Sequence, residues 1–363
     1  MIAIFLPSLK TLGGNRVLLD LAASLRAAGN DVGVFVVSDE GNTLFGHDAF
    51  SPFRISGKSR MPVPRALHFL KGARLAAKLS RENVVIFSEP LLAISLMLIG
   101  AQGFVRLHQA DDYALFDDNP RMRSKLGLSL YKWLCQRTYR MSGITNIFVS
   151  NFVAGEYAKR GGKGQRYVAR PGVNSSIFST ATNKRDGPLT IGVMARDLYW
   201  KGFADFCAAV AIAESQGLMF GEIVLIGHDD VVASFQSPFR HARPASDLEL
   251  CNELQAIDIF VHASWIEGYG LPPLEAMACG CAVIVSDSGG PSEYARDGHN
   301  CLVFTPRDRN DLANKLLSLS IDHLLRAKLQ MNGAITANQF STGVFTSEFA
   351  AVLQANGHAC SNS

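Results

Sequence analysis

The sequence of 363 residues lacks an apolar run long enough to cross a lipid bilayer. Its longest apolar run, Leu91 to Val105, is shorter than the roughly 20 residues that a membrane-spanning helix needs. Its start, Met1 to Leu6, lacks the basic region and the small-residue cleavage site of a secretory signal. We therefore expect a cytoplasmic protein, with any membrane contact peripheral and at the inner face of the cytoplasmic membrane.

A cysteine framework is also missing. The seven cysteines are an odd number, and Cys279 and Cys281 lie two apart without a histidine cluster, which is not a zinc spacing. A reducing compartment fits this usage best. We expect no metal and no cofactor, and we expect these two side chains to pack as small apolar residues.

Acidic residues are absent from residues 49–81, which carry eight Lys and Arg from Arg54 to Arg81. From Ala66 to Leu79 these basic residues alternate with apolar ones at helical spacing. This pattern is typical of a helix on an anionic membrane surface, and equally of a solvated helix with its apolar side in the core. Nucleic acid is disfavoured as a partner, because aromatic stacking residues are sparse here.

The two halves of the chain differ in charge. Residues 1–180 carry 23 Lys and Arg against 12 Asp and Glu, a balance of +11. Residues 181–363 carry 12 against 20, a balance of −8. A second basic and apolar segment, Arg121 to Arg140, adds to the positive half. The halves are therefore expected to face different partners.

The chain begins with an apolar strand, Ile2 to Leu6, a loop that ends in Gly13 and Gly14, and a helix that starts near Asn15. A second strand, Asp31 to Val37, follows, and this order is Rossmann-like. The loop lacks the complete Gly-x-Gly-x-x-Gly pattern, so a nicotinamide-dependent dehydrogenase would be without its fingerprint.

One stretch, residues 265–300, organises the later half. An apolar strand, Ile257 to Ala263, precedes a glycine loop, and Pro272 and Pro273 stand where a first helical turn would begin. A strand, a glycine loop and a helix start together make an anion site, because free amides and the positive end of the helix dipole point at the ligand. Glu267 and Glu275 flank this site, as suits a sugar nucleotide, whose hydroxyls donate hydrogen bonds to carboxylates.

The string from Glu267 to Gly280, with its Glu-x7-Glu spacing, resembles the retaining glycosyltransferases of family 4, which have the GT-B fold. The resemblance implies two Rossmann-like domains that face across a cleft, with the C-terminal helix crossing back to the first. It implies that Glu267 lies beside the donor sugar and that Glu275 holds the ribose hydroxyls. The residues of the loop, whose amides would meet sugar and phosphate, are Gly268, Tyr269, Gly270 and Leu271.

Five further positions match this family less completely. Gly13 and Gly14 match paired glycines that let the backbone approach the donor phosphate, although a plain tight turn is the alternative. His108 matches a histidine beside the donor sugar, and the resemblance implies that it is catalytic together with Glu267. Gln109 and Ala110 interrupt the family's His-Asp pair, which leaves the role of Asp111 open. A lone histidine is as often structural.

Arg196 and Lys201 match the Gly-Arg-x4-Lys-Gly segment in spacing, with Ala195 in place of the first glycine. They are expected to bind the pyrophosphate, since arginine offers a planar fork and lysine a point charge. The alternative is a surface pair with acids such as Asp205.

We expect residues 1–180, with about 340–363 crossing back, to form the acceptor-side domain, and residues 181–339 the nucleotide-sugar-binding domain. The polar linker is placed at Thr180 to Pro188.

The predicted function is transfer of a sugar from a nucleotide-diphosphate donor to a glycan or lipid-linked glycan, with retention and without a metal, in bacterial envelope polysaccharide or lipopolysaccharide biosynthesis. A sugar-nucleotide epimerase of the same fold and a non-catalytic binding relative are the alternatives. The base, the sugar, the acceptor and the oligomeric state are left open by the sequence.

Overall fold

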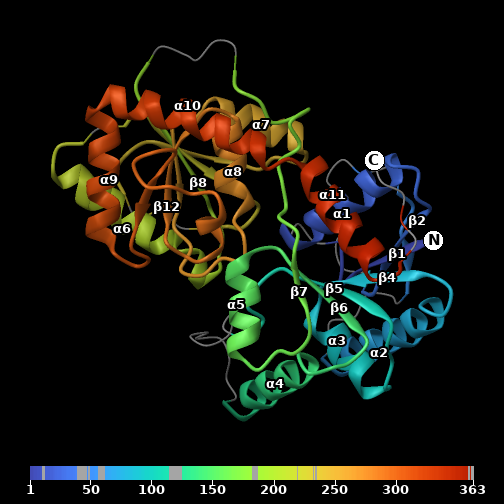
Figure 1. Cartoon of the computed structure of the whole chain (residues 1–363). Coiled ribbons are helices and arrows are strands. Elements are labelled where there is room, and N and C mark those ends of the chain that lie inside the picture. Colours follow the sequence, from blue (N-terminus) through green and yellow to red (C-terminus); the bar gives the residue numbers. More distant parts are fainter. Residues whose placement is uncertain are drawn as a thin grey trace. The chain divides into compact units, whose positions relative to one another are not determined.

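The structure, a computed structural model, describes residues 1–9, 13–38, 47, 50–55, 62–113, 125–181, 187–218, 220–231, 233, 235–358 and 360, and only the backbone of 62–65 and 125. The chain forms two compact units, Met1–Pro171 with Thr342–Ser363, and Gly172–Ser341. Each unit is built on one parallel sheet (Figure 1).

The first unit contains a seven-stranded sheet with the order β3-β2-β1-β4-β5-β6-β7, in which every pair is parallel. Its strands are β1 (Ile2–Leu6), β2 (Val32–Val36), β3 (Phe53–Arg54), β4 (Val84–Phe87), β5 (Phe104–His108), β6 (Ile144–Phe148) and β7 (Arg166–Val168). All five residues of β1 are buried, which explains its continuous apolar run, since helices cover both faces of such sheets. The strand order changes direction between β1 and β4.

Six helices of the described residues belong to this unit. They are α1 (Gly13–Ala27), α2 (Pro62–Leu79), α3 (Pro90–Leu98), α4 (Lys125–Thr138), α5 (Asn151–Lys159) and α11 (Thr342–Ala355). Helix α11, at the end of the chain, packs against α1 (Figure 1). The predicted return of the C-terminal helix to the first domain is therefore confirmed.

Helix α2 packs its apolar side into the core. Phe69, Ala73 and Ala76 are buried together with Phe5 and Phe87 of the sheet. The segment therefore has the second arrangement expected for it, a helix whose apolar side is in the core. The basic residues Lys58 and Arg60 of the same segment lie outside the described residues.

The second unit contains a six-stranded parallel sheet with the order β10-β9-β8-β11-β12-β13. Its strands are β8 (Thr190–Met194), β9 (Glu222–Ile226), β10 (Phe239–Ala242), β11 (Ile259–His262), β12 (Ala282–Ser286) and β13 (Leu302–Phe304). Strands β8 and β11 are neighbours at the centre of the sheet, with β9 and β10 following on the β8 side and β12 and β13 on the β11 side. In open sheets of this kind, ligands bind at the carboxyl ends of the strands where the order reverses.

Helices lie on both faces of this sheet. They are η2 (Tyr199–Lys201), α6 (Phe203–Ser215), α7 (Asp247–Gln255), α8 (Leu271–Ala278), η3 (Gly290–Glu293), α9 (Arg309–Ile321) and α10 (His323–Gln339). Helices α6 and α9 pack on each other, and α8 packs on α7 and α10 (Figure 1). The 17-residue helix α10 has no counterpart in the sequence analysis, because its exposed side carries apolar residues such as Leu324 and Met331 and breaks the amphipathic pattern.

The segment before Thr180–Pro188, where the sequence placed the linker, already belongs to the second unit. Val173 N donates to Phe340 O at 2.8 Å, and Gln255 Nε2 donates to Ser179 O at 2.7 Å. These contacts join the segment to α7 and to the end of α10 in the same unit. The residues from Val173 to Ser179 therefore lie beside the end of α7 and the end of α10 within the second unit.

Within the described residues, none of the helices has both the length and the apolar character that crossing a membrane requires.

Candidate functional site

The point where the strand order of the second sheet reverses collects three of the predicted site residues. Arg196 follows β8, Lys201 ends η2, and Glu267 lies on the loop after β11. Because β8 and β11 are neighbours, their carboxyl ends deliver these side chains to one edge of the sheet.

A glycine brings the lysine to this edge. Gly202 has φ +68°, and a Cβ there would overlap the backbone oxygen of Ala263 at the end of β11. Only glycine permits both this left-handed conformation and this close approach. Trp265 N donates to Trp200 O at 2.7 Å across the same junction. Lys201 is thereby held against the loop that carries Glu267.

Three side chains surround the carboxylate of Glu267. Its Oε2 lies 2.6 Å from Lys201 Nζ, 3.2 Å from His262 Nε2 and 3.2 Å from Ser264 Oγ. Burial raises the pKa of this carboxyl, but the Lys201 ammonium and the His262 ring outweigh burial and hold the pKa well below its usual range. Glu267 is therefore ionised at neutral pH.

The second glycine turn fixes the backbone of Glu267. Glu267 N donates to Ser288 O and Gly290 N donates to Glu267 O, both at 2.9 Å. A Cβ on Gly290 would overlap the backbone of Gly268. The turn after β12 thus supports the glycine loop.

Helix α8 starts at the predicted place, with proline in its first turn and Gly270 at its N-cap with φ +88°. Tyr294 Oη donates to Gly270 O at 2.5 Å. The positive dipole end of the helix lies at the loop, as an anion site requires, although the two prolines of the first turn carry no N–H, so any donor amides come from the loop and from Leu271. Tyr269 and Glu275 are both buried, at 4% and 2% exposed, so Glu275 points into the unit's interior rather than into open solvent.

Arg196 lies apart from this carboxylate. Its Nε donates to Asp229 Oδ2 at 3.0 Å, and the same oxygen accepts from Asp197 N at 2.9 Å. Asp205, the partner considered in the sequence analysis, instead accepts from Trp265 Nε1 at 2.6 Å. The structure therefore joins Lys201 to Glu267 and joins Arg196 to the loop after β9.

In the first unit, Gly13 and Gly14 begin α1. Gln109 Nε2 donates to Gly14 O at 3.0 Å, and a Cβ on Gly14 would come within 2.6 Å of Gln109 Oε1. Gln109, which interrupts the expected His-Asp pair, thus ties the loop after β5 to the start of α1.

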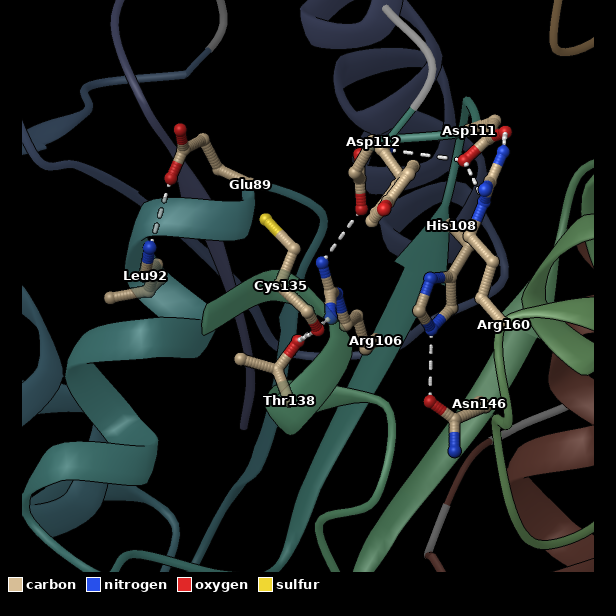
Figure 2. A network of polar contacts seen from close by, with 11 residues as sticks. Glu89, Leu92, Arg106, His108, Asp111, Asp112, Cys135, Thr138, Asn146 and Arg160 are labelled. Atoms are coloured by element: carbon tan, nitrogen blue, oxygen red, sulfur yellow. Dashed lines mark hydrogen bonds and ion pairs between the residues drawn. The ribbon is translucent and has the colours of Figure 1, made fainter. Parts of the chain in front are cut away.

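His108 ends β5 as predicted, but it is buried at 2% exposed. Its Nε2 lies 2.9 Å from Asn146 Oδ1 (Figure 2). Its ring stacks on Phe148 with the ring centroids 4.6 Å apart. Burial and the nearby Arg106 lower the pKa of the imidazole well below its usual value. These contacts are those of a neutral structural histidine, and its catalytic role stays a prediction.

A buried ion cluster lies beside His108 and was missed from the sequence. Arg106 is 1% exposed and donates to Asp112 Oδ2 at 2.9 Å and to Thr138 Oγ1 at 3.0 Å (Figure 2). Burial raises the pKa of Asp112 to about 6, against the opposing effect of Arg106. The only signal in the sequence is an arginine inside the apolar strand β5.

Two more acids accompany this cluster. Glu89 caps α3, since its Oε2 accepts from Leu92 N at 2.9 Å, and burial raises its pKa to about 7. Asp111 accepts from Arg160 Nε at 3.0 Å and contacts Arg160 Nη2 as well (Figure 2). Asp111, the nearest aspartate after His108, is therefore an ion-pair partner of Arg160. In the part of the chain that the structure describes, no three metal-ligating side chains come together.

A match to a known protein family lies within the second unit. Residues 242–335 match the family Glycosyl transferases group 1. The matched segment contains the glycine loop, Glu267 and Glu275, whereas Arg196 and Lys201 precede it. The match supports this family for the unit that carries the site.

A relative from Campylobacter jejuni subsp. jejuni serotype O:2 is an N,N'-diacetylbacillosaminyl-diphospho-undecaprenol alpha-1,3-N-acetylgalactosaminyltransferase. It is 30% identical over 162 residues, which make up 43% of this chain and 42% of the relative. The chain thus matches less than half of that protein's length.

Two solved structures are similar over the whole chain. A sucrose-phosphate synthase from Thermosynechococcus elongatus has a TM-score of 0.81 at 16% identity, and the likeness covers 98% of each chain. WaaG, a glycosyltransferase involved in lipopolysaccharide biosynthesis, has a TM-score of 0.73 at 16% identity, covering 98% of this chain and 100% of that one. The predicted fold, two Rossmann-like α/β domains as in GT-B glycosyltransferases, is confirmed.

Proposed function

We propose that this chain is a glycosyltransferase that moves a sugar from a nucleotide-diphosphate donor to a glycan or lipid-linked glycan acceptor. The observation that carries the proposal is the pair Lys201–Glu267, with 2.6 Å between Nζ and Oε2, beside a glycine loop and a helix start at the strand-order reversal. A cation and the positive end of a helix dipole suit a diphosphate, and an ionised carboxylate suits the sugar.

The relatives support the substrate class. The Campylobacter protein is named for transfer of N-acetylgalactosamine to a diphospho-undecaprenol-linked sugar, and WaaG takes part in lipopolysaccharide biosynthesis. We therefore propose a role in bacterial envelope polysaccharide biosynthesis, with the acceptor presented at the inner face of the cytoplasmic membrane. An epimerase or a non-catalytic relative gains no support from these proteins.

In the proposed reaction, Arg196, Lys201 and the amides from Gly268 to Leu271 stabilise negative charge on the leaving diphosphate. The bond between the anomeric carbon and the diphosphate oxygen breaks, and the acceptor oxygen bonds to that carbon on the same face, with retention. The acceptor's proton passes to the leaving diphosphate, so the step needs neither a metal nor a side-chain base. The negative charge of Glu267 stabilises positive charge at the anomeric carbon.

Three of the other predicted residues are given binding roles. Glu275, in the first turn of α8, is proposed to hold the ribose hydroxyls through its carboxylate. Gly13 and Gly14 are proposed to let the backbone of α1 approach the donor. His108 is proposed to act as a catalytic residue beside the donor sugar.

The test combines ligand binding with turnover. Screening nucleotide sugars by thermal shift identifies the donor, because a ligand that binds only the folded state stabilises it by mass action. Glu267→Gln is then expected to keep donor binding and to lower turnover about a hundredfold, as loss of one charge-stabilising group does. Glu275→Ala is expected to weaken donor binding.

Transfer at the wild-type rate by Glu267→Gln would refute the role of Glu267, and an unchanged donor dissociation constant in Glu275→Ala would refute the ribose role. If no nucleotide sugar stabilises the protein, or if the donor is converted without any acceptor, the transferase assignment is wrong.

A further inference from the structure

Helix α4 presents apolar side chains to solvent. Leu126, Leu130 and Trp133 are 81%, 55% and 52% exposed. They are spaced four and three residues apart, so they lie on one face of the helix. Arg137 continues this face, and its guanidinium lies 5.2 Å from the centre of the Trp133 ring. We call these four residues the α4 stripe.

The opposite face of α4 carries the polar contacts. Cys135 and Thr138 are buried, and Thr138 Oγ1 accepts from Arg106 in the interior of the unit (Figure 2). The inner face is also apolar in part, since Leu128 on it is half-buried. The helix therefore exposes leucines and a tryptophan in addition to its buried side, at positions where a surface helix usually carries polar residues. Helix α2, by contrast, buries Phe69 and its small apolar residues.

The charge of this surface is positive. Helix α4 contains Lys125, Lys132 and Arg137 and no acid, and Arg140 follows it. It belongs to the half of the sequence whose balance is +11, with 23 Lys and Arg against 12 Asp and Glu. Tryptophan and leucine beside cations are the composition of helices that lie in the interface of an anionic membrane.

We propose that the α4 stripe docks on an anionic lipid surface, with Leu126, Leu130 and Trp133 entering the acyl boundary and Arg137 and Arg140 meeting lipid phosphates. A single helical stripe suits a lipid surface better than a protein, because stable protein interfaces use about 20–30 residues on each side. The proposal does not depend on sugar transfer, since lipid binding needs no donor.

The test is vesicle flotation of the full chain without donor or acceptor. Wild type is expected to bind vesicles of phosphatidylglycerol mixed with phosphatidylcholine, and to bind pure phosphatidylcholine vesicles at least about tenfold more weakly. The triple variant Leu126→Ser, Leu130→Ser, Trp133→Ser is expected to lose at least about tenfold in binding to the mixed vesicles. Arg137→Gln with Arg140→Gln is expected to lose about fivefold for each arginine and to remove the salt dependence.

Helix α10 supplies a matched control, because Leu324, Met331 and Ile335 are 85%, 61% and 54% exposed on it. The triple serine variant of these residues is expected to bind vesicles like wild type. Wild type that ignores the mixed vesicles, or an α4 variant that binds them unchanged, overturns the proposal. So does an α10 variant that loses binding equally, or an α4 variant that only converts a dimer to a monomer in size-exclusion chromatography.

Discussion

Two ion pairs, one in each unit, show how differently the same fold uses charge. Arg106 and Asp112 in the first unit are 1% and 10% exposed at their side chains, and Lys201 and Glu267 in the second are 26% and 17% exposed. The first pair is closed in by α4, whereas the second lies on a glycine loop at a helix start. A ligand can compete for the second pair but not for the first.

The same difference sets the direction of the carboxyl pKa in each pair. Each carboxyl lies beside a cation, and burial acts to raise the pKa of each. For Asp112 burial wins and raises the pKa to about 6, although Arg106 opposes it. For Glu267 burial is outweighed by Lys201 together with His262, and the pKa falls. The additional contact with the His262 ring therefore distinguishes the ionised carboxylate of Glu267 from the buried carboxyl group of Asp112.

Replacing the cation of the closed pair is expected to give the largest effect. Arg106→Met leaves Asp112 buried without its partner, which should lower the free energy of unfolding by about 3–5 kcal/mol. Urea denaturation followed by circular dichroism measures this loss. The exposed Arg166 on β7 gives the control, since Arg166→Met should change stability by less than about 0.5 kcal/mol. If both variants cost the same, the first cluster is not a structural ion pair.

The cap of α3 should make stability depend on pH. The pKa of Glu89 is raised from 4.5 to about 7, so its contribution to stability is complete below pH 4.5 and is lost as pH rises through about 7. The loss is at most about 3 kcal/mol. Glu89→Gln keeps the acceptor for Leu92 N and removes the ionisation.

The variant should therefore match wild type near pH 4.5 and be more stable at pH 8, as read from urea midpoints at the two values. The exposed Glu82 provides the comparison, because Glu82→Gln should change neither midpoint. Equal midpoints for Glu89→Gln and wild type at pH 8 would show that Glu89 ionises without penalty in the folded protein.

The smallest stability effect is expected at the open pair. Lys201→Met should change the free energy of unfolding by less than about 1 kcal/mol, because a partly exposed ion pair contributes little. It should weaken binding of the nucleotide sugar about tenfold through the lost point charge. Isothermal titration measures the affinity, with the exposed Lys328→Met as the control. A stability loss as large as that of Arg106→Met would remove the distinction between the two pairs.

The sequence was sufficient for the framework of both sheets. Strand β1 agrees with its predicted range to the residue, and β11 lies within the predicted apolar run, because a strand buried on both faces is a continuous apolar run. The start of α8 was also predictable, since its glycines and prolines act through the local backbone. Strands β3 and β7, of two and three residues, are too short to leave a pattern.

Side-chain partners could not be predicted in the same way. The sequence offered Asp205 for the cations after β8, but the structure joins Lys201 to Glu267 and Arg196 to Asp229. His262 escaped notice because it continues an apolar strand, and only its position at the end of β11 places it 3.2 Å from Glu267. The contacts of Lys201 and Arg196 join residues 66 and 33 positions apart in the chain, so they depend on which strands are neighbours.

By itself, the sequence determined two Rossmann-like halves, a glycine loop with two acids at a helix start, and a positive first half, because these depend on local backbone chemistry and composition. The tertiary structure alone decided which ion pair is closed and which is open, and which basic helix turns its apolar side outward. The physical reason is that burial, which sets the energy of a charge and the exposure of a leucine, depends on neighbours brought together by the fold.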